Sequence, residues 1–166
     1  MFGYPTLDKW LAAREEWAPL FLRLSLGLVF LAHGAQKLLG WFGGSGWNGT
    51  MQYFTQTLHI PTVFAALVIV LEFFGGAALL AGAFTRWTAL LLGIEMVVAA
   101  LKVHLANGFF MNWANTPNAG HGIEFNVILV GALAALLVMG GGRLSLDAAL
   151  TRPFNLNEKE EARKAG

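Results

Sequence analysis

Residues 19–39 read PLFLRLSLGLVFLAHGAQKLL, a long apolar stretch that nevertheless carries ionisable side chains, and this stretch decides the fold class. An α-helix needs about 20 predominantly apolar residues to cross a hydrocarbon layer about 30 Å thick. Three further stretches of similar length follow at residues 61–83, 87–106 and 122–139, and each contains at least one ionisable residue. The sequence therefore predicts an all-α integral membrane protein, an antiparallel four-helix bundle with a polar interior.

The composition of the chain agrees with this prediction. Hydrophobic residues make up 56% of the 166 residues and charged residues 13%, whereas a soluble domain averages about a quarter charged. The helical domain is expected at residues 19–140, between an N-terminal interfacial arm at 1–18 and a polar cytoplasmic tail at 141–166. The net charge of +1 gives no basis for nucleic-acid binding, and the absence of cysteine excludes disulfides and thiol-based redox chemistry.

Lysine and arginine in short loops set the orientation of membrane helices. The N-terminal arm, the turn between the second and third stretches and the tail all contain these residues, whereas the connections at 40–60 and 107–121 contain none. The sequence therefore predicts that both termini are cytoplasmic and that the two longer connections are external. In the first of them Met51, Phe54 and Leu58 share one helical face, which indicates a short helix lying in the membrane interface.

Two acidic residues lie at the same depth in neighbouring stretches. At about 1.5 Å per residue, Glu72 and Glu95 both fall roughly 13 to 14 Å from the cytoplasmic end, at the membrane midplane. A charge at this depth must face another polar group, water or a ligand. If the two carboxyl groups face each other, the pair is suited to handling a proton. Alternatively, each acid pairs separately with a hydroxyl, a backbone carbonyl or a cation from another helix.

The first stretch carries a stripe of residues at steps of three and four. The stripe consists of Arg23, Gly27, Phe30, Gly34 and Lys37. Its two cations lie near the helix ends, where long side chains can partly reach the interface. His33 lies one turn before Lys37, at a depth that allows a short polar chain with Glu72. His33 is therefore either a proton-transfer or ligand-binding residue, or a hydrogen-bonded packing residue.

The outer boundary of the predicted bundle is also polar. Lys102 and Glu124 lie at similar depths, roughly 24 and 26 Å from the cytoplasmic ends of their stretches, and we expect them to form a salt bridge. The histidines at or just outside this boundary are His59, His104 and His121. None has the spacing of a zinc motif, and His33 and His104 differ in depth by about 7 Å, so neither a metal site nor a bis-histidine haem is expected. No flavin site is evident.

Together these residues resemble the DoxX family of small bacterial four-helix membrane proteins. The resemblance rests on RLSLGLVFLAHGAQKL at 23–38, EFFGG at 72–76, LAG at 80–82 and Arg86, and further on His104, Gly108, Phe109, Gly122, Ile123 and Glu124. It covers about residues 19–140. It implies a multi-pass protein of the bacterial cytoplasmic (inner) membrane.

Relatives of this family include the membrane subunit of a thiosulfate:quinone oxidoreductase and components of oxidative-stress redox complexes. The resemblance therefore implies a quinone-interacting subunit of a membrane oxidoreductase. Its expected partners are the lipid bilayer, a redox partner protein or other subunits of the complex and, in a homo-oligomer, further copies of itself. The alternatives are a non-catalytic membrane anchor or assembly subunit, and a small-solute or proton transporter, which the absence of an inverted repeat disfavours. The candidate catalytic residues are Glu72 and His33, and the candidate ligand-binding residues are Arg23, Lys37, Glu95, Lys102, His104 and Glu124.

Overall fold

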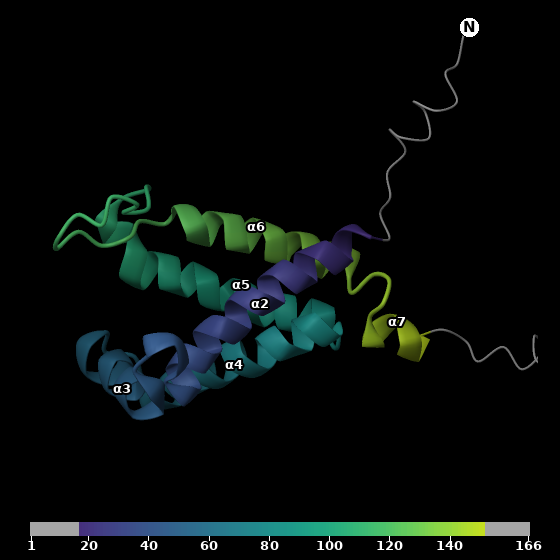
Figure 1. Ribbon diagram of the computed structural model, residues 1–166, viewed down its shortest axis with the longest axis horizontal. Helices are drawn as coiled ribbons and strands as arrows, with labels where there is room; N and C mark the ends of the chain where they lie inside the picture. The colour runs from purple at the N-terminus through teal and green to yellow at the C-terminus, as the bar shows by residue number, and fades with distance from the viewer. Residues whose placement is uncertain (1–16, 152–166) are drawn as a thin grey trace, which may run out of the picture.

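The computed structural model describes residues 17–151, within which all regular secondary structure is helical and no strand occurs. Four helices form the body: α2 (Ala18–Leu39), α4 (Thr62–Ala81), α5 (Thr85–Ala99) and α6 (Glu124–Met139). Figure 1 shows these helices running lengthwise along the molecule. Nearly all of the interfacial arm predicted at 1–18, and the end of the predicted tail, lie outside the described residues.

Shorter helical pieces extend the body at both ends. They are a 3-10 turn at Trp41–Gly43, α3 (Gly46–Gln52), π-helical turns at Tyr53–Thr57 and Ala100–His104, a 3-10 turn at Leu105–Asn107, and α7 (Leu146–Thr151). The helix predicted around Met51 and Phe54 is therefore present as α3 and the π-helical turn that follows it. In Figure 1 this segment lies at the end of the molecule opposite α7.

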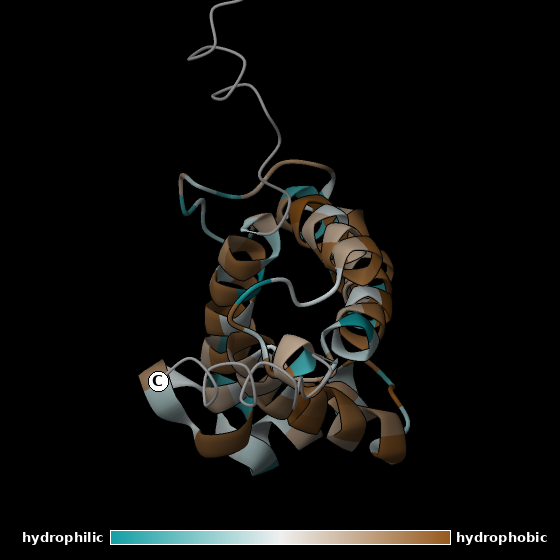
Figure 2. Cartoon of the chain, turned by 90° about the vertical axis from the view of Figure 1, so that its right-hand side faces the viewer, coloured by the Kyte–Doolittle hydropathy of each residue, from teal (hydrophilic) through white to brown (hydrophobic). Residues whose placement is uncertain are grey.

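Three segments are long and apolar enough to cross a membrane, at Ala18–Leu39, Thr62–Ala81 and Thr85–Asn107. The fourth helix, α6, has 16 residues, which span about 24 Å. It begins two residues later than expected, and the N–H groups of Gly122 and Ile123 bond to loop carbonyls of Phe110 and Gly108. Figure 2, coloured by hydropathy, shows that the long helices are mostly apolar. Large apolar side chains on their outer faces are exposed, as lipid contact requires.

The core lies where α2, α4, α5 and α6 meet. Its buried apolar residues are Leu26, Phe30, Leu79, Ala89, Leu92, Met96, Leu129, Leu133 and Leu136. Every one of the four helices contributes to this set, so the apolar stretches predicted from the sequence pack on one another rather than forming separate units.

Helices α2 and α4 touch backbone to backbone through glycine. A Cβ atom added to Gly34 would lie 2.4 Å from the Cα atom of Phe73, and one added to Gly76 would lie 2.3 Å from the backbone nitrogen of Leu31. Gly27 and Gly34 are both buried. The stripe predicted on the first stretch is therefore confirmed as the face of α2 that packs on α4, in the manner of small-residue contacts between membrane helices.

We expect Gly34→Ala to destabilise the protein by about 3 kcal/mol or more, because the new methyl group meets backbone atoms that cannot move out of its way. The matched control is Gly131→Ala in α6, where no atom lies within 4 Å of the added Cβ atom. That control should keep or slightly raise stability, because alanine is the better helix former. Thermal unfolding in mild detergent measures both, and equal melting temperatures for the two variants would contradict the close α2/α4 contact.

Arg23, near the start of α2, is buried inside the protein. The residue is 1% exposed. Its five N–H donors bond to five backbone carbonyl oxygens, of Leu79, Leu80, Gly141, Arg143 and Leu144. Arginine has five such donors and no more. Arg23 therefore acts as a structural clamp, and all five of its donors are used by backbone carbonyl groups of the protein.

The same contacts correct the predicted domain boundary at residue 140. Arg23 fastens the turn that follows α6 to the end of α4. In α7, the Asp147 carboxylate accepts hydrogen bonds from the backbone N–H groups of Phe84 and Thr85, at 2.7 and 2.8 Å, and so caps the start of α5. Residues 141–151 thus belong to the folded body and not to a solvated tail.

Candidate functional site

An ion pair between Lys37 of α2 and Glu72 of α4 forms the centre of the site. The Nζ atom of Lys37 bonds to Oε1 of Glu72. Glu72 is 2% exposed, whereas the side chain of Lys37 is 25% exposed. The expectation that a midplane acid pairs with a cation from another helix is therefore confirmed for Glu72.

Glu95 of α5 completes this group, which we name the ionic centre and define as Lys37, Glu72 and Glu95. Its carboxyl group interacts with that of Glu72 and lies within the electrostatic influence of Lys37. The two acids therefore also face each other, as the depth argument allowed. Among residues 17–151, no partner reaches Oε2 of Glu72 or Oε2 of Glu95, although both atoms are buried.

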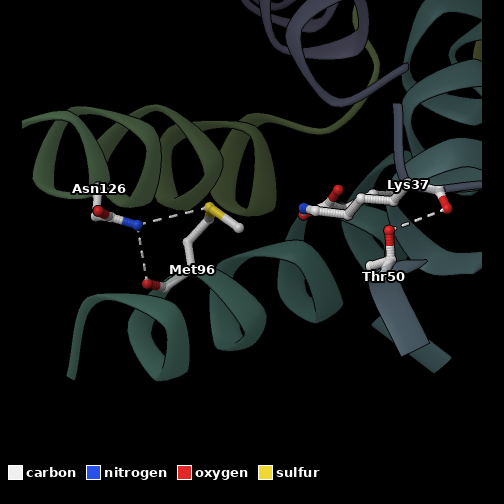
Figure 3. A network of polar contacts seen from close by, with 5 residues as sticks. Lys37, Thr50, Met96 and Asn126 are labelled. Carbon is white, nitrogen blue, oxygen red and sulfur yellow. Dashed lines mark hydrogen bonds and ion pairs between the residues drawn. The ribbon is translucent and has the colours of Figure 1, made fainter. Parts of the chain in front are cut away.

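The glycine contact between α2 and α4 explains why the pair forms. A Cβ atom on Gly34 would lie 2.8 Å from the carbonyl carbon of Glu72, so α2 meets α4 at the level of that acid. Lys37 follows one turn later on the same face. Thr50 of α3 donates a hydrogen bond to the backbone carbonyl of Lys37 at 3.3 Å, which holds the end of α2 in place, as Figure 3 shows.

A cavity of about 350 Å³ adjoins the ionic centre, and we call it the outer cavity. Its polar lining comes from His33, Lys37, Glu72, His104 and His121, and its apolar lining includes Phe30, Met96, Phe125 and Leu129. His33 and His104, predicted from the sequence as site residues, therefore lie in one cavity with the ion pair. In Figure 3 the Lys37 side chain extends between the helices toward the side on which Met96 and Asn126 lie.

A second cavity of about 550 Å³ lies on the other side of the ionic centre, between α4 and α5. We call it the lipid groove, because exposed apolar side chains of the outer helix faces border it, including Phe64, Leu67, Leu91, Ile94 and Val98. Lys37, Glu72, Ala99 and His104 line both cavities. The ionic centre therefore lies between a space under the connection at 107–121 and a space bordered by the exposed apolar faces of α4 and α5.

The predicted salt bridge between Lys102 and Glu124 is wrong. Between these two described residues no ion pair forms; Glu124 instead accepts a hydrogen bond from the backbone N–H of Met111 at 3.0 Å. Lys102 is exposed and lines the lipid groove. The π-helical turn at Ala100–His104 places more residues in each turn than an α-helix does, so the extrapolated α-helical geometry does not fix the side on which Lys102 lies.

Sequence reasoning missed two polar residues of the outer cavity. The Asn126 side chain of α6 donates a hydrogen bond to the carbonyl of Met96 at 3.4 Å and is 6% exposed. The carbonyl oxygen of His121 lies 3.0 Å from Nδ1 of His104, and Nδ1 of His121 accepts the N–H of Asn112 at 3.2 Å. Asn126 could have been found as a polar residue inside an apolar stretch, whereas the place of His121 depends on a loop.

Comparisons with known proteins agree with a membrane protein of this type. The sequence model of the DoxX family matches residues 18–105. The "Inner membrane protein YqjF" of Escherichia coli is 31% identical over 84% of this chain and 97% of its own length. The "Putative oxidoreductase CatD" of Bacillus subtilis is 27% identical over 80% of this chain and 86% of its own length.

A third relative, the "Uncharacterized membrane protein Rv3486" of Mycobacterium tuberculosis, is 30% identical over 89% of this chain and 90% of its own length. No solved structure matches the chain. The family match covers just over half of the chain, including α2, α4 and α5 with all three residues of the ionic centre. The chain belongs to the DoxX family of membrane proteins.

Proposed function

We propose that this chain is a quinone-interacting subunit of a membrane oxidoreductase, with the quinone head group bound in the outer cavity. The observation that carries the proposal is the combination of a cation, three imidazoles and apolar walls around one cavity. Its volume of about 350 Å³ falls within the range of small-molecule sites. The name of the Bacillus subtilis relative supports the oxidoreductase class.

The residues present fit the chemistry of a quinone head group. A quinone has two carbonyl oxygens that accept hydrogen bonds and a flat apolar ring. Lys37 and His33 offer the donors, and Phe30 and Phe125 offer apolar surface. When bound, a quinone supplies a two-electron acceptor inside the membrane.

In this proposal each polar residue has a separate task. Lys37 donates a hydrogen bond to one carbonyl oxygen, and Glu72 holds the ammonium group in position. The imidazole of His33 holds or transfers a proton at the cavity edge, where it is exposed. Electrons come from a partner redox protein or from the reduced substrate of the complex.

We further propose that α6 also crosses the membrane, so that α2, α4, α5 and α6 form an antiparallel four-helix bundle in a bacterial inner membrane. Arg86 and Arg143 lie at the end of the molecule that carries α7, and the connections at 40–60 and 107–121 contain no lysine or arginine. This distribution supports cytoplasmic termini. The outer cavity then lies in the external half of the bundle.

Cysteine labelling tests this orientation. Ser45→Cys and Ala114→Cys lie in the two longer connections and should react with a membrane-impermeant thiol reagent in intact cells, whereas Ala149→Cys in α7 should react only after lysis. All three positions are exposed, and the natural chain has no cysteine to interfere. Labelling of Ala149→Cys alone in intact cells would reverse the orientation.

Ligand-induced stabilisation tests the proposed function. Quinones of the ubiquinone and menaquinone types should raise the melting temperature of the purified protein, because a ligand at 100 times its Kd adds about 2.7 kcal/mol of stability. His33→Leu should weaken binding roughly 3- to 10-fold through loss of one hydrogen bond. The control His59→Leu should bind as wild type does, because His59 does not line the outer cavity. Unchanged melting with every quinone would favour the membrane anchor instead.

A further inference from the structure

The lipid groove contains two buried carboxyl oxygens, Oε2 of Glu72 and Oε2 of Glu95, for which the described part of the chain provides no hydrogen-bond partner. Glu72 and Glu95 line the groove and are 2% and 8% exposed. Within residues 17–151, no donor reaches Oε2 of either residue. Buried polar atoms without partners cost free energy, so each such atom calls for an explanation. Two acceptors in one wall indicate a ligand that carries hydrogen-bond donors.

The rest of the groove specifies an apolar ligand body. Leu67, Ile94 and Val98 border it and are about half exposed, at 55%, 55% and 46%. In a membrane such surfaces face lipid, so a molecule dissolved in the bilayer meets the groove without passing through water. Its polar end would lie at the ionic centre and its apolar end would remain between α4 and α5.

From these observations we infer that the lipid groove binds a lipid-soluble hydroquinone, whose phenolic hydroxyl groups donate hydrogen bonds to the free carboxyl oxygens of Glu72 and Glu95. This inference rests on the proposed function and assigns the oxidised and reduced forms to different sides of the ionic centre. The outer cavity offers the donors Lys37 and His33, which match the carbonyl oxygens of a quinone. The groove offers acceptors, which match hydroxyl groups.

A matched pair of ligands tests the hydrogen bonds. The probes are a decyl-substituted hydroquinone, kept reduced under anaerobic conditions, and its dimethyl ether, which has the same ring and tail but no donor. We expect the hydroquinone to bind the purified protein at least tenfold more tightly than the ether. Equal affinity would overturn the assignment to Glu72 and Glu95. A hydroquinone without the tail should also bind more weakly, because the apolar part of the groove then stays empty.

A matched pair of variants tests the place of binding. Val98 lines the groove, whereas the neighbouring Val97, with a similar exposure of 43%, does not. Val98→Trp should reduce hydroquinone affinity at least tenfold and leave the quinone-induced melting shift intact, and Val97→Trp should bind both forms normally. Leu67→Trp fills the groove from α4 and should repeat the effect of Val98→Trp.

The outcomes separate this inference from the proposed function. If wild type binds the quinone and the hydroquinone but Val98→Trp and Leu67→Trp bind the hydroquinone normally, the groove is not its site and the proposed function stands. If wild type binds neither form, both the inference and the proposed function fail. Loss of hydroquinone binding in the two groove variants, with retention in Val97→Trp, supports the inference.

Discussion

The Arg23→Met variant is expected to lose more than about 4 kcal/mol of stability and to accumulate poorly in membranes. The guanidinium group satisfies five carbonyl oxygens contributed by the end of α4 and by the turn after α6. A buried acceptor left without a partner costs about 1 to 3 kcal/mol, and partial hydration recovers only some of this. Losses above about 4 kcal/mol are exceptional for single substitutions.

The control for this prediction is Arg86→Met. Arg86 is exposed and donates one hydrogen bond, to the carbonyl of Leu137 at 3.0 Å, so its loss should change stability little. Arg23→Lys should behave like Arg23→Met, because an ammonium group has three donors and cannot reproduce the planar fork. Membrane levels and the thermal unfolding midpoint report both effects. If Arg23→Met and Arg86→Met are equally stable, Arg23 is not the clamp described above.

Breaking the ion pair of the ionic centre is expected to have the second largest effect. Lys37→Met leaves the Glu72 carboxylate, with 3% of its side chain exposed, buried without its cation, and such a loss costs about 3 to 5 kcal/mol. Glu72→Gln should cost less, because Lys37 is a quarter exposed and lines a cavity that water can enter. The asymmetry between the two single variants is part of the prediction.

The double variant Lys37→Met with Glu72→Gln should recover part of the loss, because it removes both charges together. Thermal unfolding of the four proteins in one detergent gives the coupling energy. Strictly additive losses of stability would mean that the interaction between Lys37 and Glu72 does not stabilise the protein. The result also matters for function, since a folded double variant is the natural control for ligand binding at this site.

The sequence predicted that two of the buried acids lie at the same level. Glu72 and Glu95 meet because the rise of an α-helix is regular, so counting residues from the membrane boundary places two side chains at one level. The stripe on α2 was predicted from helical spacing, since Gly27 and Gly34 recur at steps of three and four, but its role as the close contact with α4 appears only in the structure.

Other features could not be predicted, because they depend on backbone groups and on helix rotation. Arg23 bonds to carbonyl oxygens of residues 141, 143 and 144. Every residue has a backbone carbonyl group, so the sequence does not show which of them accept a hydrogen bond from a side chain. The predicted pair of Lys102 with Glu124 is absent, and Lys102 lies in a π-helical turn that α-helical spacing does not predict. The partner of Glu72 was left open between alternatives, since depth alone does not say which side chains face each other.

Mass spectrometry of lipids extracted from the purified protein tests the central claim most directly. After mild-detergent purification and extensive washing, wild type should retain about one isoprenoid quinone or hydroquinone per chain, since the ionic centre provides donors on one side and acceptors on the other. The folded double variant Lys37→Met with Glu72→Gln should retain far less. A quinone content in wild type no higher than in that variant would contradict a quinone site at the ionic centre.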